Sequence, residues 1–180
     1  PVIEEGIINL KVNNEIIIEN RDEEEWVYLY TFYNAENQIA QRITKLDKAR
    51  NVKKVSNIEK ELRLVEERTD IILSEKQKEA VKAINDNNVT IITGGPGTGK
   101  TTIIKSIIEI YKQKKYKIVL CAPTGRAAKR MSETTGEEAS TLHRLLEIGK
   151  VDEESLFKKD NEYQGAPIDG DIIIVDEVSM

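Results

Sequence analysis

The chain has 180 residues and a formal net charge of −5, with 33% charged and 39% hydrophobic residues. This length suits one domain, or one domain with a small addition. No apolar run could span a bilayer, no signal peptide is evident, and the single cysteine excludes an internal disulfide or cysteine-based metal site, so a cytoplasmic location is the default expectation.

Residues 1–70 are predicted to form a small leader domain of mixed or mainly helical structure. Two apolar segments, residues 7–12 and 15–19, are typical of β-strands. Asn13 and Asn14 lie between them and suit a tight hairpin turn. Nothing in this region carries a catalytic pattern.

Helical patterns follow these strands. Apolar residues take helical spacing between residues 26 and 54, and the capping-box sequence at 56–59 predicts a further helix through about Glu67. A second capping box, from Ser74 to Gln77, opens the next helix.

Gln77 has two competing roles. Near the start of its helix, its amide would stabilise the first turn. A glutamine shortly before a phosphate-binding loop can also read the edge of an adenine through its amide donor and acceptor. Both roles stay open, although they require the same side chain.

The segment from Gly94 to Thr102, Gly-Gly-Pro-Gly-Thr-Gly-Lys-Thr-Thr, satisfies the phosphate-loop pattern G-x-x-x-x-G-K-[ST]. The apolar run at 89–93 predicts a strand before it, and isoleucines at helical spacing predict a helix after it. An accidental glycine-rich turn is the alternative, but this context disfavours it. The residues predicted to bind phosphate are Gly95, Pro96, Gly97, Thr98, Gly99, Lys100, Thr101 and Thr102.

The residue types of this loop suit a polyphosphate. Glycines let the backbone wrap the anion, and the loop then presents its N–H groups and the positive end of the next helix. Lys100 is predicted to supply a positive charge for the β and γ phosphates, and the Thr101 hydroxyl to ligate Mg²⁺. The chain is therefore predicted to bind a nucleoside triphosphate with Mg²⁺.

Residues 116–122 predict the next strand, and residues 126–131 the helix after it. Thr124, at the carboxyl end of this strand, could contact a nucleic-acid phosphate or simply cap the helix. The helix carries three basic side chains, Arg126 among them.

Residues 139–146 predict a short helix that contains His143. A lone histidine is more often a satisfied surface or core residue than a functional one.

Residues 147–170 are polar and irregular and are interpreted as a surface excursion. Lys and Arg outnumber Glu between Lys100 and Arg144, which permits a polyanion track on one face without requiring one.

Residues 171–175 are typical of a buried parallel strand, and it ends in two carboxylates. Asp176 is predicted to hold the Mg²⁺ shell, and Glu177 to polarise the attacking water. A solvated loop start is the alternative interpretation. Residues 71–180 are thus predicted to form an α/β domain with a parallel sheet of the P-loop NTPase type.

Several of these segments, in this order, resemble the Q motif and motifs one, one-a, one-b and two of the RecD-like helicases of superfamily one. The segments are Gln77, Gly94 to Thr102, Ala122 to Met131, Ser140 to Leu146, and Val175 to Met180. The ordered set is more specific than any single element. Its most discriminating strings are Thr-Gly-Arg-Ala-Ala and Asp-Glu-Val-Ser-Met.

The resemblance implies a RecA-like lobe of an ATP-driven motor that steps 5′ to 3′ along single-stranded DNA and unwinds duplex in recombination or repair. It assigns adenine reading to Gln77, and it assigns contacts with the DNA strand to Thr124, Arg126 and His143. It leaves open whether the protein acts alone or with the subunits of a nuclease complex.

In this family the pattern continues with a second motor lobe and its arginines, which stabilise the transferring phosphate. The chain is therefore expected to be an N-terminal fragment that binds ATP and Mg²⁺ weakly, hydrolyses ATP slowly if at all, and does not translocate. Its sheet is expected to leave strand edges exposed, with a risk of self-association.

Two other functions remain open. One is a P-loop ATPase of another class, such as a clamp-loader-like or transporter-type motor, which would not explain Gln77 or the Thr-Gly-Arg-Ala-Ala turn. The other is a non-enzymatic module, in which the leader domain docks a partner and the nucleotide site acts as a switch.

Overall fold

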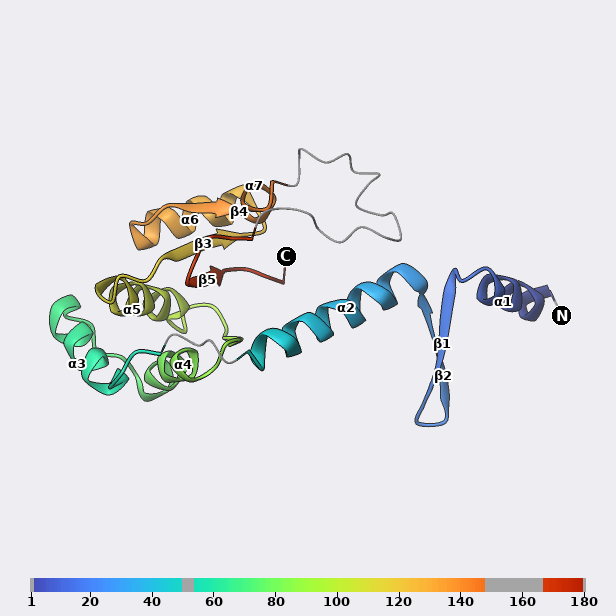
Figure 1. Ribbon diagram of the computed structural model, residues 1–180, viewed down its shortest axis with the longest axis horizontal. Coiled ribbons are helices and arrows are strands. Elements are labelled where there is room, and N and C mark those ends of the chain that lie inside the picture. The colour runs from blue at the N-terminus through green and yellow to red at the C-terminus, as the bar shows by residue number, and fades with distance from the viewer. Residues whose placement is uncertain (1, 50–53, 148–166, 180) are drawn as a thin grey trace. The chain divides into compact units, whose positions relative to one another are not determined.

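The computed structural model describes residues 2–49, 54–147 and 167–179. The chain divides into two compact units, residues 1–52 and 53–180 (Figure 1). This division lies before the boundary expected at residue 70. The helix that follows residue 57 contributes its apolar face to the core of the second unit, and so it joins that unit rather than the leader.

The first unit contains a helix, a β-hairpin and a long helix. They are α1 (Val2–Val12), β1 (Ile16–Arg21), β2 (Glu24–Leu29) and α2 (Tyr30–Asp47). The two strands pair antiparallel, with Ile16 opposite Leu29. The Tyr33 hydroxyl on α2 donates to the carboxylate of Glu19 on β1, which lowers the pKa of that carboxyl.

The predicted strand at 7–12 and the predicted turn at Asn13 and Asn14 are both wrong. Residues 7–12 belong to α1, whose acidic first turn and basic last turn suit the helix dipole. Asn14 adopts a φ of 57° and ends this helix, while the hairpin turn forms at Asp22 and Glu23, with φ of 50° and 68°. Asparagine tolerates positive φ in helix ends and in hairpin turns alike, so the Asn-Asn pair did not distinguish them.

The second unit is an α/β arrangement. Its helices are α3 (Ile58–Thr69), α4 (Glu75–Asp86), α5 (Lys100–Gln113), α6 (Gly125–Thr135) and α7 (Leu142–Leu145), and its strands are β3 (Ile118–Ala122), β4 (Ala139–Thr141) and β5 (Ile172–Val175). The described strands form a parallel sheet in the order β4-β3-β5, with Leu120 of β3 opposite both Ala139 and Ile174. Parallel strands joined through helices confirm the predicted α/β class.

Helix α5 is the centre of the core. Ile110 and Tyr111 are almost completely buried and pack with residues of α3 and α4, including Leu62 and Val65. Nearer the start of the same helix, Ile104 packs with Leu120 of β3 and with Met131 of α6. Burial of this apolar surface, at roughly 25 cal/mol per Å², holds α5 between the helical pair and the sheet.

Three expectations about the strands need correction. Residues 89–93 form no strand, because the described residues supply no ladder partner for them, although Ile92 still packs against the core. Residues 139–141 form β4, so the helix expected from 139 begins only at Leu142. Strand β5 is parallel as predicted but not buried on both faces, since Ile173 and Val175 are 45% and 36% exposed.

The two capping predictions differ in outcome. Asn57, not Ser56, caps α3, since its side chain accepts from the Lys60 N–H. The Ser74 capping box of α4 is confirmed.

Across the parts of the chain that the structure describes, none of the helices combines the length and apolar character needed to cross a membrane.

Candidate functional site

The predicted phosphate loop leads from the end of α4 into the first turn of α5. Gly99 is the N-cap of α5 and has a φ of 84°, a conformation that L side chains rarely adopt. A Cβ at this position would also lie 2.2 Å from the Gln77 Nε2 atom. The backbone conformation therefore favours glycine at residue 99, and any larger residue would also displace the end of the Gln77 side chain.

The loop is closed by contacts among its own residues. The Lys100 ammonium donates to the carbonyls of Gly94 and Gly95, at 2.6 and 3.0 Å, and the Thr98 hydroxyl donates to the Gly95 carbonyl at 2.9 Å. Residues 94–98 are exposed. A phosphate oxygen can therefore replace the carbonyls as the partner of Lys100 without any opening of the core.

Helix α5 begins without a side-chain cap. The other described helices of the second unit are each capped by a side chain, from Asn57, Ser74, Thr124 or Thr141. At α5 the N-cap is Gly99, which has no side chain to accept from the N–H groups of the first turn. Those N–H groups and the positive end of the helix are therefore left available to an anion, where the phosphate-loop pattern predicts one.

Gln77 connects the start of α4 to this loop. Its Oε1 accepts from the Ser74 N–H at 2.9 Å, and its Nε2 donates to the Thr98 carbonyl at 3.4 Å. Both the oxygen and the nitrogen of the Gln77 amide therefore already have hydrogen-bond partners within the protein. Adenine reading by Gln77 stays a prediction, and it requires the amide to exchange at least one of these two partners.

We expect Gln77→Ala to weaken ATP binding about tenfold while tripolyphosphate binding changes little. The Ser74 side chain can still accept from the N–H of residue 77 and cap α4, but alanine cannot donate to an adenine acceptor, and one such hydrogen bond is worth about 1 kcal/mol or somewhat more. Isothermal titration with each ligand checks this. An equal loss for both ligands would show that Gln77 acts on the loop through Thr98 and does not read adenine.

The carboxyl ends of the parallel strands bring the remaining candidates to one edge of the sheet. Thr124 follows β3, His143 lies on α7 directly after β4, and Asp176 follows β5. The Asp176 N–H donates to the Cys121 carbonyl at 3.0 Å, which continues the ladder one residue past β5. In open parallel sheets, ligands bind outside this edge.

The phosphate loop belongs to the same edge by topology. Helix α5 returns to β3 through a short turn in which the Tyr116 N–H donates to the Tyr111 carbonyl, so the C-terminus of α5 lies near the start of β3. Its N-terminus, with Lys100 and Thr101, therefore points toward the carboxyl edge. Among the described residues, no hydrogen bond or ion pair joins the loop directly to Asp176 or Glu177.

Asp176 and Glu177 are held in different ways. The Asp176 Oδ1 accepts from the Glu177 N–H at 2.9 Å, and Glu177 has a φ of 54°. The Glu177 carboxylate lies 4.0 Å from the Arg130 guanidinium of α6. The two adjacent carboxylates thus have separate surroundings, as their separate predicted roles require.

The predicted DNA contacts have local structural roles as well. Thr124 caps α6, since its hydroxyl oxygen accepts from the Ala127 N–H at 3.2 Å, so the capping role is confirmed and a phosphate contact stays a prediction. Arg126 and His143 are exposed. Arg130 was not among the predicted contacts, although its position one helical turn after Arg126 was a signal for it.

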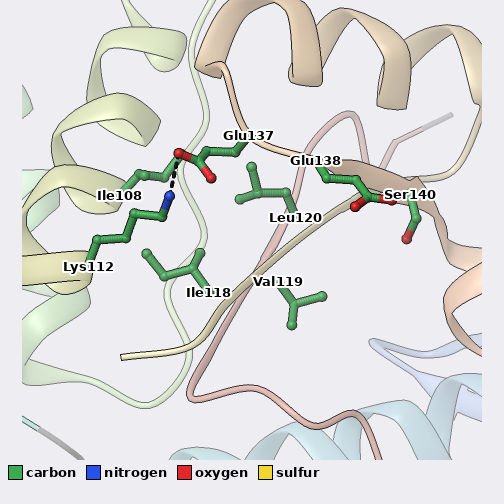
Figure 2. A pocket seen from close by; sticks show the side chains of 8 residues that line it. All are labelled: Ile108, Lys112, Ile118, Val119, Leu120, Glu137, Glu138 and Ser140. Atoms are coloured by element: carbon green, nitrogen blue, oxygen red, sulfur yellow. Dashed lines mark ion pairs between the residues drawn. The ribbon is translucent and has the colours of Figure 1, made fainter. Parts of the chain in front are cut away.

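A cavity of about 290 Å³ lies away from all of these residues (Figure 2). Figure 2 shows the Lys112–Glu137 ion pair, 2.5 Å long, on one side of the cavity, with Glu138 and Ser140 on the other. Because Ile118 opens β3 and Lys112 lies in the last turn of α5, the cavity is at the amino end of β3. None of the predicted nucleotide-binding residues lines it.

The residues present fit a nucleotide and a divalent cation. The uncapped first turn of α5 and the Lys100 ammonium suit the phosphates, while the Thr101 hydroxyl and the Asp176 carboxylate are the oxygen ligands that Mg²⁺ prefers. When bound, Mg²⁺ would neutralise charge on the phosphates.

The closed glycine loop, the uncapped helix after it and the parallel sheet define a P-loop NTPase fold. Residues 77–180 match the family model described as AAA domain. The chain belongs to this family.

Curated relatives extend the comparison. The chain is 43% identical over 108 residues, 60% of its length, to the ATP-dependent RecD2 DNA helicase of Deinococcus radiodurans. It is 34% identical over 174 residues, 86% of its length, to the RecBCD enzyme subunit RecD of Buchnera aphidicola, and 40% identical over 116 residues, 60% of its length, to the ATP-dependent DNA helicase dda of Enterobacteria phage T4. The resemblance to RecD-like helicases is confirmed.

The chain spans only a small part of these relatives. The matches cover 14% of the Deinococcus protein, 27% of the Buchnera protein and 26% of the phage protein. The family-model match, residues 77–180, includes the phosphate loop and the strand-end carboxylates.

Proposed function

We propose that this chain is the ATP-binding part of a 5′ to 3′ DNA helicase that acts in recombination or repair. The observation that carries the proposal is the pairing of an uncapped phosphate-loop helix with a parallel sheet edge where Thr124, His143 and Asp176 follow adjacent strands. The helicase names of the relatives favour this function over a P-loop ATPase of another class.

The nucleotide proposed is ATP, with Mg²⁺. Residues 95–102 would hold its phosphates, and Gln77 would read its adenine. Thr101 and Asp176 would ligate the cation. Glu177 would accept a proton from the attacking water, for which its position one residue past Asp176 is suited.

The second ligand proposed is single-stranded DNA. Arg126 is exposed on α6, His143 is exposed on α7, and both helices follow the carboxyl edge of the sheet. Phosphate contacts by such residues position a strand without reading its sequence. Subunits of a nuclease complex are a further partner of the whole protein under this proposal, as the name of the Buchnera relative suggests.

We expect the 180-residue chain to bind ATP and Mg²⁺ but to turn over slowly, with little stimulation by single-stranded DNA. The matches span 14–27% of the three helicases compared, and an arginine that stabilises the transferring phosphate is worth about a thousandfold or more in rate. Titration with ATP and a coupled assay of phosphate release, with and without oligo-dT, measure binding and turnover.

Glu177→Gln is the companion variant in this assay. It should keep ATP affinity within about twofold and remove the residual turnover, because a neutral amide cannot accept the proton of water. Absence of ATP binding by the parent chain would overturn the proposed function. Brisk DNA-stimulated turnover by the same chain would instead contradict only the expectation of slow hydrolysis.

A further inference from the structure

An ion pair connects α6 to the strand-end carboxylates. The Arg130 Nη1 atom lies 4.0 Å from the Glu177 Oε1 atom. The Arg130 side chain is 76% exposed, while that of Glu177 is 28% exposed. The contact therefore joins a solvent-facing cation to the carboxylate proposed to accept a proton from water.

Arg130 belongs to a basic face of α6. Arg126, Lys129 and Arg130 are all exposed, whereas Ala127 and Met131 are buried against the rest of the unit. Residues three and four apart lie on one side of a helix, so the three cations share a face. A phosphodiester chain that runs along this face would contact Arg130, the cation that lies 4.0 Å from Glu177.

A DNA phosphate on this face would compete with the Glu177 carboxylate for the Arg130 guanidinium, and the two interactions differ in strength. An exposed ion pair contributes little, since solvent screens it and two long side chains must be ordered to form it. A phosphate that approaches the exposed guanidinium can accept two parallel hydrogen bonds from it, whereas the Glu177 carboxylate at 4.0 Å accepts none. The distance of 4.0 Å leaves the pair with Glu177 looser than a direct hydrogen bond.

We propose that Arg130 is a positioning residue that couples DNA binding to Glu177. Without DNA it draws the Glu177 carboxylate toward α6, and a DNA phosphate that takes the guanidinium releases that carboxylate toward the nucleotide. This inference rests on the proposed function. Because such coupling is reciprocal, Glu177 must also oppose DNA binding through Arg130.

A double-mutant cycle on DNA affinity tests the coupling without relying on turnover. We expect Glu177→Gln to tighten binding of labelled oligo-dT by about two- to fivefold, the range expected for an exposed pair. In an Arg130→Ala background the same change should have no effect. Fluorescence anisotropy on the four proteins, at one fixed salt concentration, gives the affinities.

Glu133→Gln is the matched control for charge alone. Glu133 is an exposed carboxylate on the same helix and lies 3.9 Å from Lys129. Removal of its charge should change DNA affinity equally with and without Arg130. If Glu177→Gln behaves in this same way, its effect is a general charge effect and the coupling is overturned.

A spectroscopic measurement reports on Glu177 directly. With ¹³C-labelled glutamate, oligo-dT should shift the Glu177 carboxyl resonance in the parent chain and in Arg130→Lys, but not in Arg130→Ala. DNA binding without this pattern overturns the inference and leaves the proposed function intact. Absence of DNA binding in every variant would overturn the inference together with the proposed DNA ligand, while ATP binding would still be judged separately.

Discussion

Replacement of Lys100 by alanine should weaken ATP binding about ten- to a hundredfold. A hydrogen bond from a charged donor contributes about 1.5–3 kcal/mol, and each 1.4 kcal/mol corresponds to a factor of ten in affinity. The Lys100 ammonium lies against the carbonyls of Gly94 and Gly95, within an exposed loop that phosphate can reach. Isothermal titration with ATP and Mg²⁺ measures the loss.

This loss should occur without loss of fold. Lys100 is the first residue of α5, where a positive charge opposes the helix dipole, so its removal should change the free energy of unfolding by only about 0.5 kcal/mol. Lys105→Ala is the matched control, since Lys105 is exposed one turn later on the same helix. Equal ATP affinity in Lys100→Ala and Lys105→Ala would contradict the assignment of the loop.

The second large effect concerns stability and is expected at Asn85. Its side chain is buried, with 5% of the residue exposed, at the junction of α4, α5 and the segment before α3. The Asn85 Oδ1 accepts from the Val55 N–H at 2.7 Å and from the Tyr111 hydroxyl at 3.3 Å, and its Nδ2 donates to the Val55 carbonyl at 3.3 Å. Burial raises the pKa of Tyr111 to about 12, so this hydroxyl stays a neutral donor.

We expect Asn85→Leu to lower the free energy of unfolding by about 3–5 kcal/mol. Leucine has a similar branched shape but leaves the buried N–H and carbonyl of Val55 without partners, which costs about 1–3 kcal/mol for each group. The total free energy of unfolding of such a domain is only about 5–15 kcal/mol, so this loss is a large part of it. Urea unfolding followed by circular dichroism measures it.

Asn87→Leu is the control for this substitution. Asn87 is exposed, and its side-chain amide donates to the Ala83 carbonyl at 2.8 Å at the end of α4, so we expect a cost of about 1 kcal/mol or less. A similar cost for both asparagines would show that the buried network adds nothing to stability.

The parts of the site that depend on short segments could be predicted from the sequence. The phosphate loop, the Ser74 capping box and the parallel strand before Asp176 each need only a few neighbouring residues. Their patterns specify backbone conformation and hydrogen bonds within one turn or strand. The structure therefore confirms the cap and the parallel strand at nearly the expected positions.

Predictions from the sequence were wrong where the same residues are compatible with two different local structures. Asn13 and Asn14 could turn a hairpin or end a helix, and in the structure they end α1, where the Asn13 N–H donates to the Asn9 carbonyl. Residues 89–93 have the composition of a strand, but a strand also needs a neighbour, which no short segment can supply.

The phosphate-loop pattern, the Ser74 cap, the strands that became β3 and β5, and the order of the motifs could all be read from short segments of the sequence. The contact of Gln77 with Thr98, the three segments joined by Asn85 and the approach of Arg130 to Glu177 are visible only in the folded chain. These partners lie between 21 and 47 positions apart in the chain, so their contacts depend on how helices pack against the sheet. Local propensity carries no information about such packing, and it is this packing that brings the carboxylate of Glu177, at one strand end, within 4.0 Å of the basic helix α6.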